Sequence, residues 1–269
     1  MQKTILITGS TDGIGLEAAK KLVAQGHKIL LHGRSKKKLN HAQKTLSELS
    51  SEGNVETYLA DLSDLEDVET LAEAVTEKHN KLDVLINNAG VFRAPSPIAK
   101  NGLDVRFVVN TIAPYLLVQK LIPLFGSSSR VINLSSAAQS PVNPEALLGR
   151  VKIEDDFDTY AQSKLALTMW SHRMGLSLKE NGPIVFAVNP GSLLATKMVK
   201  EGFGMPGKDI NIGANILARL ALDAEFSNAF GQYFDNDVGQ LTSPHPDCLN
   251  AQKCDGVIRA IEIVLSYED

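Results

Sequence analysis

The sequence has few of the features that mark specialised protein classes. Among 269 residues there are two cysteines, Cys248 and Cys254, whose spacing fits neither a redox pair nor a zinc half-site. The six histidines include no pair at the i, i+4 spacing of a helical metal site. Lys and Arg number 27 and Asp and Glu 31, a net charge of −4 that is too balanced to indicate a nucleic-acid or membrane-surface binder. We therefore expect no metal and no nucleic-acid partner.

The chain also lacks an uninterrupted apolar run long enough for a membrane span. Its most apolar stretch, 107–125, contains Asn110, Gln119 and Lys120 as well as two prolines, which favours a buried helix. The apolar run at 4–8 is too short for the core of a signal peptide and is followed by glycines. We expect no transmembrane segment, no export and a cytoplasmic protein.

Short β-rich runs alternate with longer helical ones along the chain. With 43% apolar residues the protein can form a large core, and the alternation predicts an α/β fold in which helices cover both faces of a parallel sheet. The expected strands are 4–8, 28–32, 55–59, 82–87, 130–135 and 183–188, and the expected helices are 13–25, 36–50, 64–79, 103–125 and 158–179.

Two local signals predict helix ends. Ser63 with Glu66 three residues later predicts a capping box that opens the helix at 64. Gly26 predicts a left-handed residue that ends the first helix. No repeat and no Pro/Gly/Ser-rich linker divides the chain, so residues 1–269 are expected to form one domain.

A glycine-rich segment joins the first strand to the first helix. Its pattern is Thr-Gly-x-x-x-Gly-x-Gly. Glycines let the chain turn tightly and approach phosphate groups, and a helix N-terminus attracts a diphosphate. The segment is a candidate dinucleotide site, with a glycine-rich turn that binds nothing as the alternative. Its candidate contacts are Gly9, Ser10, Thr11, Asp12, Gly13, Ile14 and Gly15.

Four further motifs follow in register: Asn-Asn-Ala-Gly at 87–90, Ser-Ser at 135–136, Tyr-x-x-x-Lys at 160–164 and Asn-Pro-Gly at 189–191. With the glycine pattern, they resemble the short-chain dehydrogenase/reductase family over nearly the whole chain. The resemblance implies a doubly wound Rossmann fold of about seven strands, the last at 232–234. It also implies a cofactor half of about 1–135 and a catalytic half of about 136–269.

The end of the second strand bears on the choice of cofactor. An acidic residue there would bond the adenosine ribose and repel a 2′-phosphate, but the sequence has Arg34, Ser35 and three lysines at 36–38. A guanidinium fork suits a phosphate, so NADP(H) is favoured over NAD(H); alternatively, Arg34 stacks on adenine and the lysines form a solvated helix face. The resemblance implies adenine contacts from Asp61 and Leu62, although Asp61 could equally cap a turn. It adds cofactor contacts from Asn88, Ala89, Gly90, Pro190, Gly191 and Thr196.

Tyr160 and Lys164 are spaced i, i+4, which puts both on one face of a helix. A phenol has a pKa of about 10, and a nearby cation lowers it toward neutral pH. An ordinary surface pair is the alternative. The resemblance implies that Tyr160 is the acid/base and that Lys164 also orients the nicotinamide ribose. It further implies that Ser136 rather than Ser135 polarises a carbonyl, and that Asn110 holds a water next to Lys164; Asn110 could instead, or as well, bond a neighbouring helix.

Two segments depart from the family pattern. The stretch 139–158 is longer than in compact members, which resembles the branch of retinol dehydrogenases and protochlorophyllide reductases and implies a small to medium apolar substrate. The membrane-bound animal members carry an N-terminal anchor, so a retinoid is not the expected substrate. The stretch 197–207 predicts a mobile lid or, alternatively, a flexible surface loop, and Thr196 stands one residue further from Gly191 than the family's threonine usually does.

These patterns predict an NADP(H)-dependent oxidoreductase that interconverts a carbonyl and an alcohol by hydride transfer, without a metal. A rival hypothesis is a catalytically silent regulator that senses NADP(H). The complete set of Asn110, Ser136, Tyr160 and Lys164 favours the enzyme. The expected partner is a small apolar molecule, and the chain could be a monomer or a homodimer.

Overall fold

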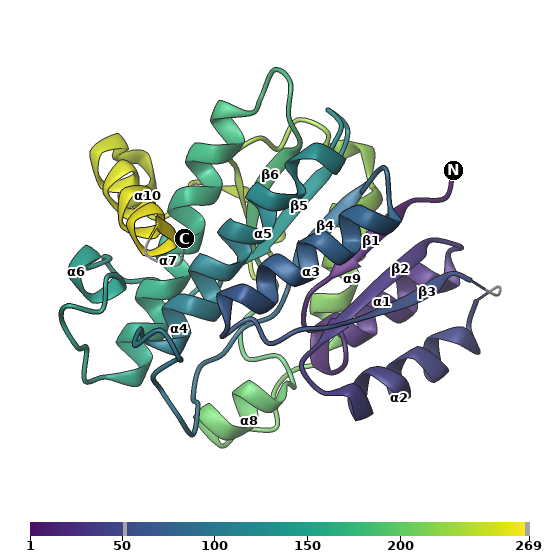
Figure 1. The fold of residues 1–269 in the computed structure, drawn as a ribbon, viewed down its shortest axis with the longest axis horizontal. Helices are drawn as coiled ribbons and strands as arrows, with labels where there is room; N and C mark the ends of the chain where they lie inside the picture. Colours follow the sequence, from purple (N-terminus) through teal and green to yellow (C-terminus); the bar gives the residue numbers. More distant parts are fainter. Residues whose placement is uncertain (51–52, 267–269) are drawn as a thin grey trace.

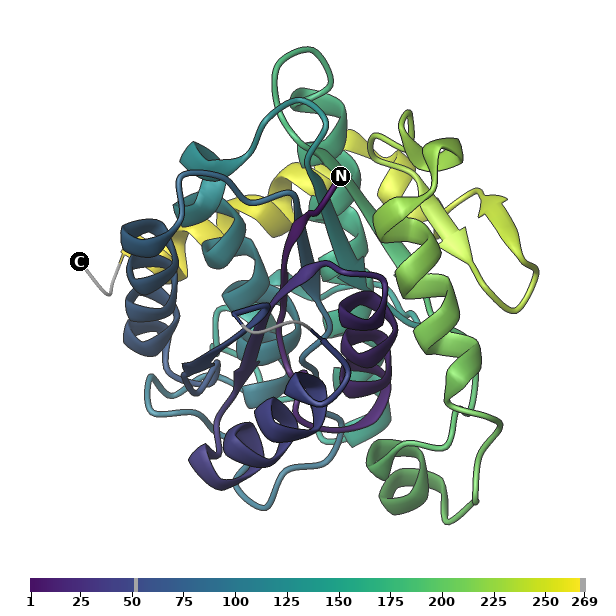
Figure 2. The ribbon, with the colours of Figure 1, turned by 90° about the vertical axis from the view of Figure 1, so that its right-hand side faces the viewer.

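The computed structural model describes residues 1–50 and 53–266, and one eight-stranded sheet forms its centre (Figures 1 and 2). The strand order is β3-β2-β1-β4-β5-β6-β7-β8, with every neighbouring pair parallel except β7 and β8. The strands are β1 (Thr4–Ile7), β2 (Lys28–Gly33), β3 (Val55–Leu59), β4 (Val84–Asn87), β5 (Arg130–Leu134), β6 (Ile184–Asn189), β7 (Tyr233–Asp235) and β8 (Gln240–Thr242). The doubly wound fold is confirmed, with one strand more than predicted, because β8 turns back along the edge of β7.

Helices cover both faces of the sheet (Figure 1). Those on one face are α3 (Leu65–Lys78), α4 (Val105–Phe107), α5 (Ala113–Leu121) and α7 (Asp156–Ser177), with α10 (Ala251–Ser266) packed on α7. Those on the other are α1 (Gly13–Ala24), α2 (Lys36–Ser47) and α9 (Asn211–Leu222). Two short helices, α6 (Pro144–Leu147) and α8 (Lys197–Phe203), lie in loops.

The inner strands β1, β4 and β6 are largely apolar runs because each faces a core on both sides. In β1, Leu6 packs into the core beneath α3 and α5, whereas Ile5 and Ile7 pack into the core beneath α1 and α9. All three side chains are fully buried. Strands buried on both faces show no polar alternation, which is why the sequence predicts them as unbroken runs.

The predicted helix 103–125 is interrupted. It consists of α4, a π-helical turn at 108–112, α5 and a 3-10 turn at 122–124. Pro114 cannot donate the i→i−4 hydrogen bond to the carbonyl of Asn110, and the π turn accommodates this break. The run Val105–Leu124 is the one helical stretch in the described residues that is long and apolar enough to cross a membrane by length and composition, and 78% of its most apolar window is buried within the fold. This burial agrees with the prediction that the apolar stretch 107–125 forms a buried helix.

The capping box at Ser63 is wrong. Helix α3 begins after Asp64, and the Ser63 hydroxyl instead donates to Asp61 Oδ1 at 2.8 Å. The left-handed residue after the first helix is confirmed, since Gly26 has a φ of 84°.

The sheet has a topological switch point between β1 and β4. The chain runs from β1 outward to β2 and β3, then crosses back to continue through β4 and β5 in the opposite direction. Connections on either side of such a point leave in opposite directions, which opens a crevice at the carboxyl ends of the two strands.

Candidate active site

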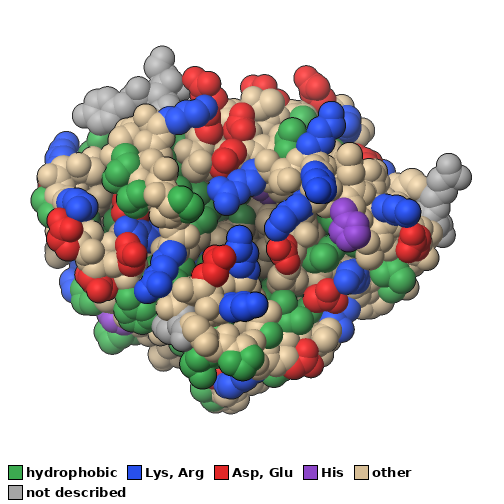
Figure 3. Space-filling view, turned by 90° about the horizontal axis from the view of Figure 1, so that it is seen from below, with side chains coloured by type: hydrophobic (Ala, Val, Ile, Leu, Met, Phe, Trp, Pro, Cys, Tyr) green, Lys and Arg blue, Asp and Glu red, His purple; other side chains and the backbone are tan. Residues whose placement is uncertain are grey.

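A cleft of about 760 Å³ lies at this edge of the sheet. Figure 3 shows this face of the molecule, on which Lys and Arg side chains gather around the centre with acidic side chains among them. The cleft is lined by the glycine loop, by the loops after β2, β3, β4, β5 and β6, and by residues of α7 and α8. Segments from both halves of the chain, far apart in sequence, therefore line the same cleft.

The glycine loop is held by the loop after β4. The Asn88 side chain donates to the carbonyls of Thr8 and Gly9 at 2.9 and 3.0 Å, and the Ala89 amide donates to the Thr8 hydroxyl at 3.1 Å. A Cβ at Gly9 would lie 2.9 Å from the Ala89 Cα, so no larger residue fits there. Gly13 has a φ of 60° and open space where a Cβ would be, so its backbone is bare toward the cleft. This bare loop at the start of α1 fits a dinucleotide diphosphate.

His32 is a site residue that the sequence patterns missed. Its Nδ1 accepts from the Gly9 amide at 3.1 Å, so its Nε2 carries the proton and donates to the Ala60 carbonyl at 3.1 Å. Burial lowers the pKa of His32 to about 4. A neutral imidazole thus fastens the glycine loop to the ends of β2 and β3. Its position two residues before Arg34 on an apolar strand was the only available signal.

The end of β2 forms one end of the cleft. Arg34 is exposed and lines it. Ser35 caps α2 by accepting from the Lys38 amide at 3.4 Å. Asp61 lines the cleft and also caps a turn, since its Oδ1 accepts from the amide and the hydroxyl of Ser63. In this structure Asp61 therefore caps a turn, which was the alternative interpretation of this residue.

Four predicted site residues do not line the cleft. Ser10 is fully buried and exchanges hydrogen bonds with the backbone of His32. Gly15 lies against Asn88, where a Cβ would come within 2.4 Å of the amide nitrogen. The other two are Ser35, which caps α2, and Asn110, which is 1% exposed. The remaining predicted residues line the cleft: Gly9, Thr11, Asp12, Gly13, Ile14, Arg34, Asp61, Leu62, Asn88, Ala89, Gly90, Ser136, Tyr160, Lys164, Pro190, Gly191 and Thr196.

Tyr160 and Ser136 meet inside the cleft. Burial raises the pKa of Tyr160, and a hydrogen bond with the Ser136 side chain acts against that rise. Ser135 also lines the cleft, but its hydroxyl bonds α7, where it donates to the carbonyl of Lys164 and contacts the hydroxyl of Thr168. The alternating directions of a strand end account for this difference between two adjacent serines.

Lys164 lies one turn after Tyr160 and is 4% exposed. Its Nζ donates to the Leu134 carbonyl at 2.7 Å and lies 5.8 Å from the centre of the Tyr160 ring. Burial lowers the pKa of Lys164 to about 7. The sequence predicts a lowered pKa for Tyr160, whereas burial raises it in this structure.

Asn110 joins the loop after β4 to α7. Its Oδ1 accepts from the Val91 amide at 2.8 Å, and its Nδ2 donates to the Val91 carbonyl and to the Ser163 hydroxyl, both at 2.9 Å. Asn110 stands within the π-helical turn, a feature that is frequent at functional sites. The predicted hydrogen bond to a neighbouring helix is therefore present.

The predicted lid, residues 197–207, borders one side of the cleft. Helix α8 begins after Thr196, whose hydroxyl accepts from the Val199 amide at 3.2 Å. The ends of the segment are clamped together, because Ala195 and Lys208 are joined by a backbone hydrogen bond of 2.7 Å and the Lys208 amide bonds the Leu193 carbonyl at 2.7 Å. Among the described residues, Leu193 is the one non-glycine with a positive φ, 56°.

Aromatic and apolar side chains form the wall next to Tyr160. The Phe92 ring packs edge-on against Tyr160 with ring centroids 5.2 Å apart, and against Phe157 at 6.3 Å. Met198 and Val199 of the lid line the same cleft. The phenol therefore operates beside an apolar surface.

The fold and the cleft define a doubly wound α/β protein with a ligand crevice at its switch point. The model of the short chain dehydrogenase family matches residues 3–205, and the chain belongs to this family. It is thus an oxidoreductase of the short-chain dehydrogenase/reductase type.

Several known proteins are similar to it over most of its length. Mouse retinol dehydrogenase 13 is 29% identical over 91% of this chain and 79% of its own, and mouse retinol dehydrogenase 12 is 30% identical over 87% and 78%. The short-chain dehydrogenase TIC 32 A, chloroplastic, of Brassica napus is 28% identical over 86% and 79%. These relatives confirm the predicted branch.

Solved structures share the fold. A putative uncharacterized protein from Mycobacterium paratuberculosis superposes with a TM-score of 0.79 at 24% identity, covering 98% of this chain and 93% of that one. A metagenomic short-chain oxidoreductase in complex with NADP has a TM-score of 0.63 at 27% identity, covering 83% and 92%.

Proposed function

We propose that this protein interconverts an apolar aldehyde or ketone and its alcohol, with NADP(H) as the cofactor and Tyr160 as the acid/base. The observation that carries the proposal is that Tyr160 and Ser136 line the same cleft, with the Lys164 Nζ 5.8 Å from the centre of the Tyr160 ring. A hydroxyl pair of this kind can hold a carbonyl oxygen and move a proton to it.

The chain's own residues divide the work. Tyr160 gives its proton to the substrate oxygen on reduction and takes one on oxidation. Ser136 donates a hydrogen bond to the same oxygen. Lys164 would bind the nicotinamide ribose through Nζ, which would give its buried charge a polar partner besides the Leu134 carbonyl. When bound, the cofactor supplies or accepts the hydride. Thr196 would contact the nicotinamide end of the cofactor, and the bare glycine loop would hold its diphosphate.

The preference for NADP(H) has two supports. Arg34 lines the cleft where the sequence has no acidic residue, and a guanidinium matches a phosphate in charge and shape. The metagenomic relative is described in complex with NADP. The apolar wall of Phe92, Phe157 and Met198 supports an apolar substrate.

The test compares Tyr160→Phe with Tyr115→Phe, using NADPH oxidation with a panel of ketones and aldehydes. Tyr115 is a buried tyrosine that bonds Glu262 at 3.1 Å and does not line the cleft. We expect Tyr160→Phe to abolish turnover while still binding NADPH, and Tyr115→Phe to stay active. Retention of most activity in Tyr160→Phe would overturn the assignment. NADPH binding without turnover on any substrate would instead support the NADP(H)-sensing regulator.

A further inference from the structure

We infer that Arg106 is a positioning residue for the reaction: by anchoring the first turn of α7, it sets the orientation of Tyr160. The inference rests on the proposed role of Tyr160. Arg106 itself does not line the cleft.

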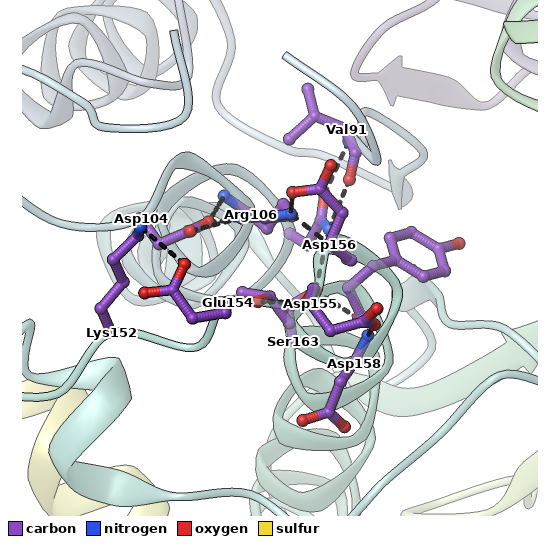
Figure 4. Close-up of polar contacts among 12 residues, drawn as sticks. Val91, Asp104, Arg106, Lys152, Glu154, Asp155, Asp156, Asp158 and Ser163 are labelled. Atoms are coloured by element: carbon purple, nitrogen blue, oxygen red, sulfur yellow. Dashed lines mark hydrogen bonds and ion pairs between the residues drawn. The ribbon is translucent and has the colours of Figure 1, made fainter. Parts of the chain in front are cut away.

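Arg106 links α4 to α7 from a buried position. Its side chain is 5% exposed and lies between Asp104 and Asp156 (Figure 4). Nε and Nη2 donate to the two carboxylate oxygens of Asp104 at 2.8 and 2.6 Å, which is a bidentate pair. Nη1 donates to the carboxylate of Asp156 and, at 3.2 Å, to its backbone carbonyl.

The contact with the Asp156 carbonyl bears directly on Tyr160. Asp156 is the first residue of α7, and in an α-helix a carbonyl accepts the amide four residues later, which here belongs to Tyr160. A carbonyl has two lone pairs and can accept from both donors. Arg106 therefore holds the same oxygen that fixes the backbone of Tyr160.

The other side of Tyr160 is fixed from the same segment of chain. The Ser163 hydroxyl donates to the Tyr160 carbonyl at 2.7 Å and accepts from Asn110 Nδ2 at 2.9 Å. Thr111 donates to the Ser163 carbonyl at 2.8 Å. Side chains from residues 104–111 thus hold the first two turns of α7 on both sides of the tyrosine.

Charge balance alone does not require this arrangement. Asp104, with a side chain 17% exposed, already neutralises Arg106 and caps α4 by accepting from the Arg106 amide. Asp156 is the more exposed partner, at 55%. The other two hydrogen bonds of the Arg106 guanidinium are made with Asp156 of α7. Because a displacement of about 1 Å can cost up to about 100-fold in rate, such an anchor matters to a proton donor.

The experiment uses the full chain with Arg106→Gln, Arg106→Lys and Asp156→Asn. Arg173→Gln is the matched control, since Arg173 joins the same helix to Asp255 of α10. The readouts are kcat at saturating NADPH, the Kd for NADPH, and the pH dependence of alcohol oxidation. The last reports the Tyr160 phenol, whose pKa the Ser136 hydrogen bond lowers and burial raises, with Lys164 as the charged group beside its ring.

We expect kcat in Arg106→Gln to fall about tenfold or more and kcat in Asp156→Asn, which keeps the backbone carbonyl contact, to fall less, with the Kd for NADPH within about twofold of wild type in both. The midpoint of the pH profile moves to higher pH as the bond to Ser136 loosens. Arg106→Lys keeps the charge without the fork and recovers part of the rate. Arg173→Gln loses thermal stability but keeps the wild-type pH profile.

Unchanged kcat and pH profile in folded Arg106→Gln would overturn the inference. Arg106→Lys keeps the buried positive charge beside Asp104 but lacks the fork that also reaches the Asp156 carbonyl. If Arg106→Gln does not fold, a wild-type kcat and pH profile in Arg106→Lys would overturn the inference. Tyr160→Phe separates the two proposals. If it retains activity, the proposed function fails, whereas if it is inactive and the Arg106 variants are normal, only the positioning role fails.

Discussion

Asp12 and Lys38 form an ion pair beside the cleft, with Lys38 Nζ 2.9 Å from Asp12 Oδ2. Asp12 is the N-cap of α1 and accepts from the Gly13 amide at 2.9 Å, while Lys38 lies in the first turn of α2. The hydrogen bond from Lys38 is the main cause of the lowered pKa of Asp12. An uncompensated carboxylate here would repel a phosphate at the helix N-terminus, so Lys38 neutralises a charge that would oppose the cofactor.

This pair predicts different cofactor effects for two neighbouring cations. Lys38→Ala uncovers Asp12 and should weaken NADPH and NADH alike, because both carry the diphosphate. Arg34→Ala should weaken NADPH about 10- to 100-fold and leave NADH nearly unchanged, as expected for a charged hydrogen bond to the 2′-phosphate. Fluorescence titration of both cofactors measures this. Adding Asp12→Asn to Lys38→Ala should restore NADH binding, and an equal loss of both cofactors in Arg34→Ala would refute the NADP(H) preference.

His32 predicts an acid sensitivity of the fold. Its pKa is about 4 in the folded protein and about 6.5 in an unfolded chain, so the unfolded state takes up the proton first. The contribution of His32 to the free energy of unfolding is complete above about pH 6.5. Up to about 3 kcal/mol of this contribution is lost as the pH falls toward 4. Urea unfolding from pH 7 to 4.5 should show a smaller loss in His32→Gln than in wild type. His41→Gln, at an exposed position, should behave as wild type; identical pH slopes in all three would contradict the prediction.

Lys164 predicts a conflict between stability and activity. Its pKa is lowered by burial to about 7 from about 10.5, so the cofactor-free protein gains stability as the pH rises from 7 to 10.5. Lys164→Met removes the buried charge, worth up to about 5 kcal/mol, but leaves the Leu134 carbonyl unpaired at about 1–3 kcal/mol. We expect it to be inactive yet about 2 kcal/mol more stable at pH 7 by denaturant unfolding. Lys197→Met, an exposed change, is the control, and a destabilised Lys164→Met would count against this account.

The sheet was predictable because its strands are buried on both faces. The run 183–188, for example, holds only apolar residues, and β6 occupies Ile184–Asn189. The interruption at 108–112 was not predicted, since an apolar stretch looks the same whether its turns are α or π. Pro114 was the available warning. The predicted capping box does not form because the Ser63 hydroxyl donates to Asp61 instead. A pattern that consists only of Ser63 and Glu66 does not reveal this competing partner.

Cleft residues that belong to sequence motifs could be predicted, whereas residues that act through contacts between distant segments could not. Tyr160, Lys164 and Ser136 were found by spacing and resemblance, and all three line the cleft. His32 was missed because its partners, Gly9 and Ala60, lie 23 and 28 residues away in sequence. Arg106 is equally silent in the sequence, since its partner Asp156 lies 50 residues further along.

The clamp between Leu194 and Lys208 makes the lid a separable insert. Because the two ends of the segment meet at one bridge, its length and composition can change without shifting the register of β6 or β7. Met198 and Val199 face the cleft from within this insert. We therefore expect that changes within this one segment can reshape the surface beside the cleft while the sheet and the glycine loop keep their structure.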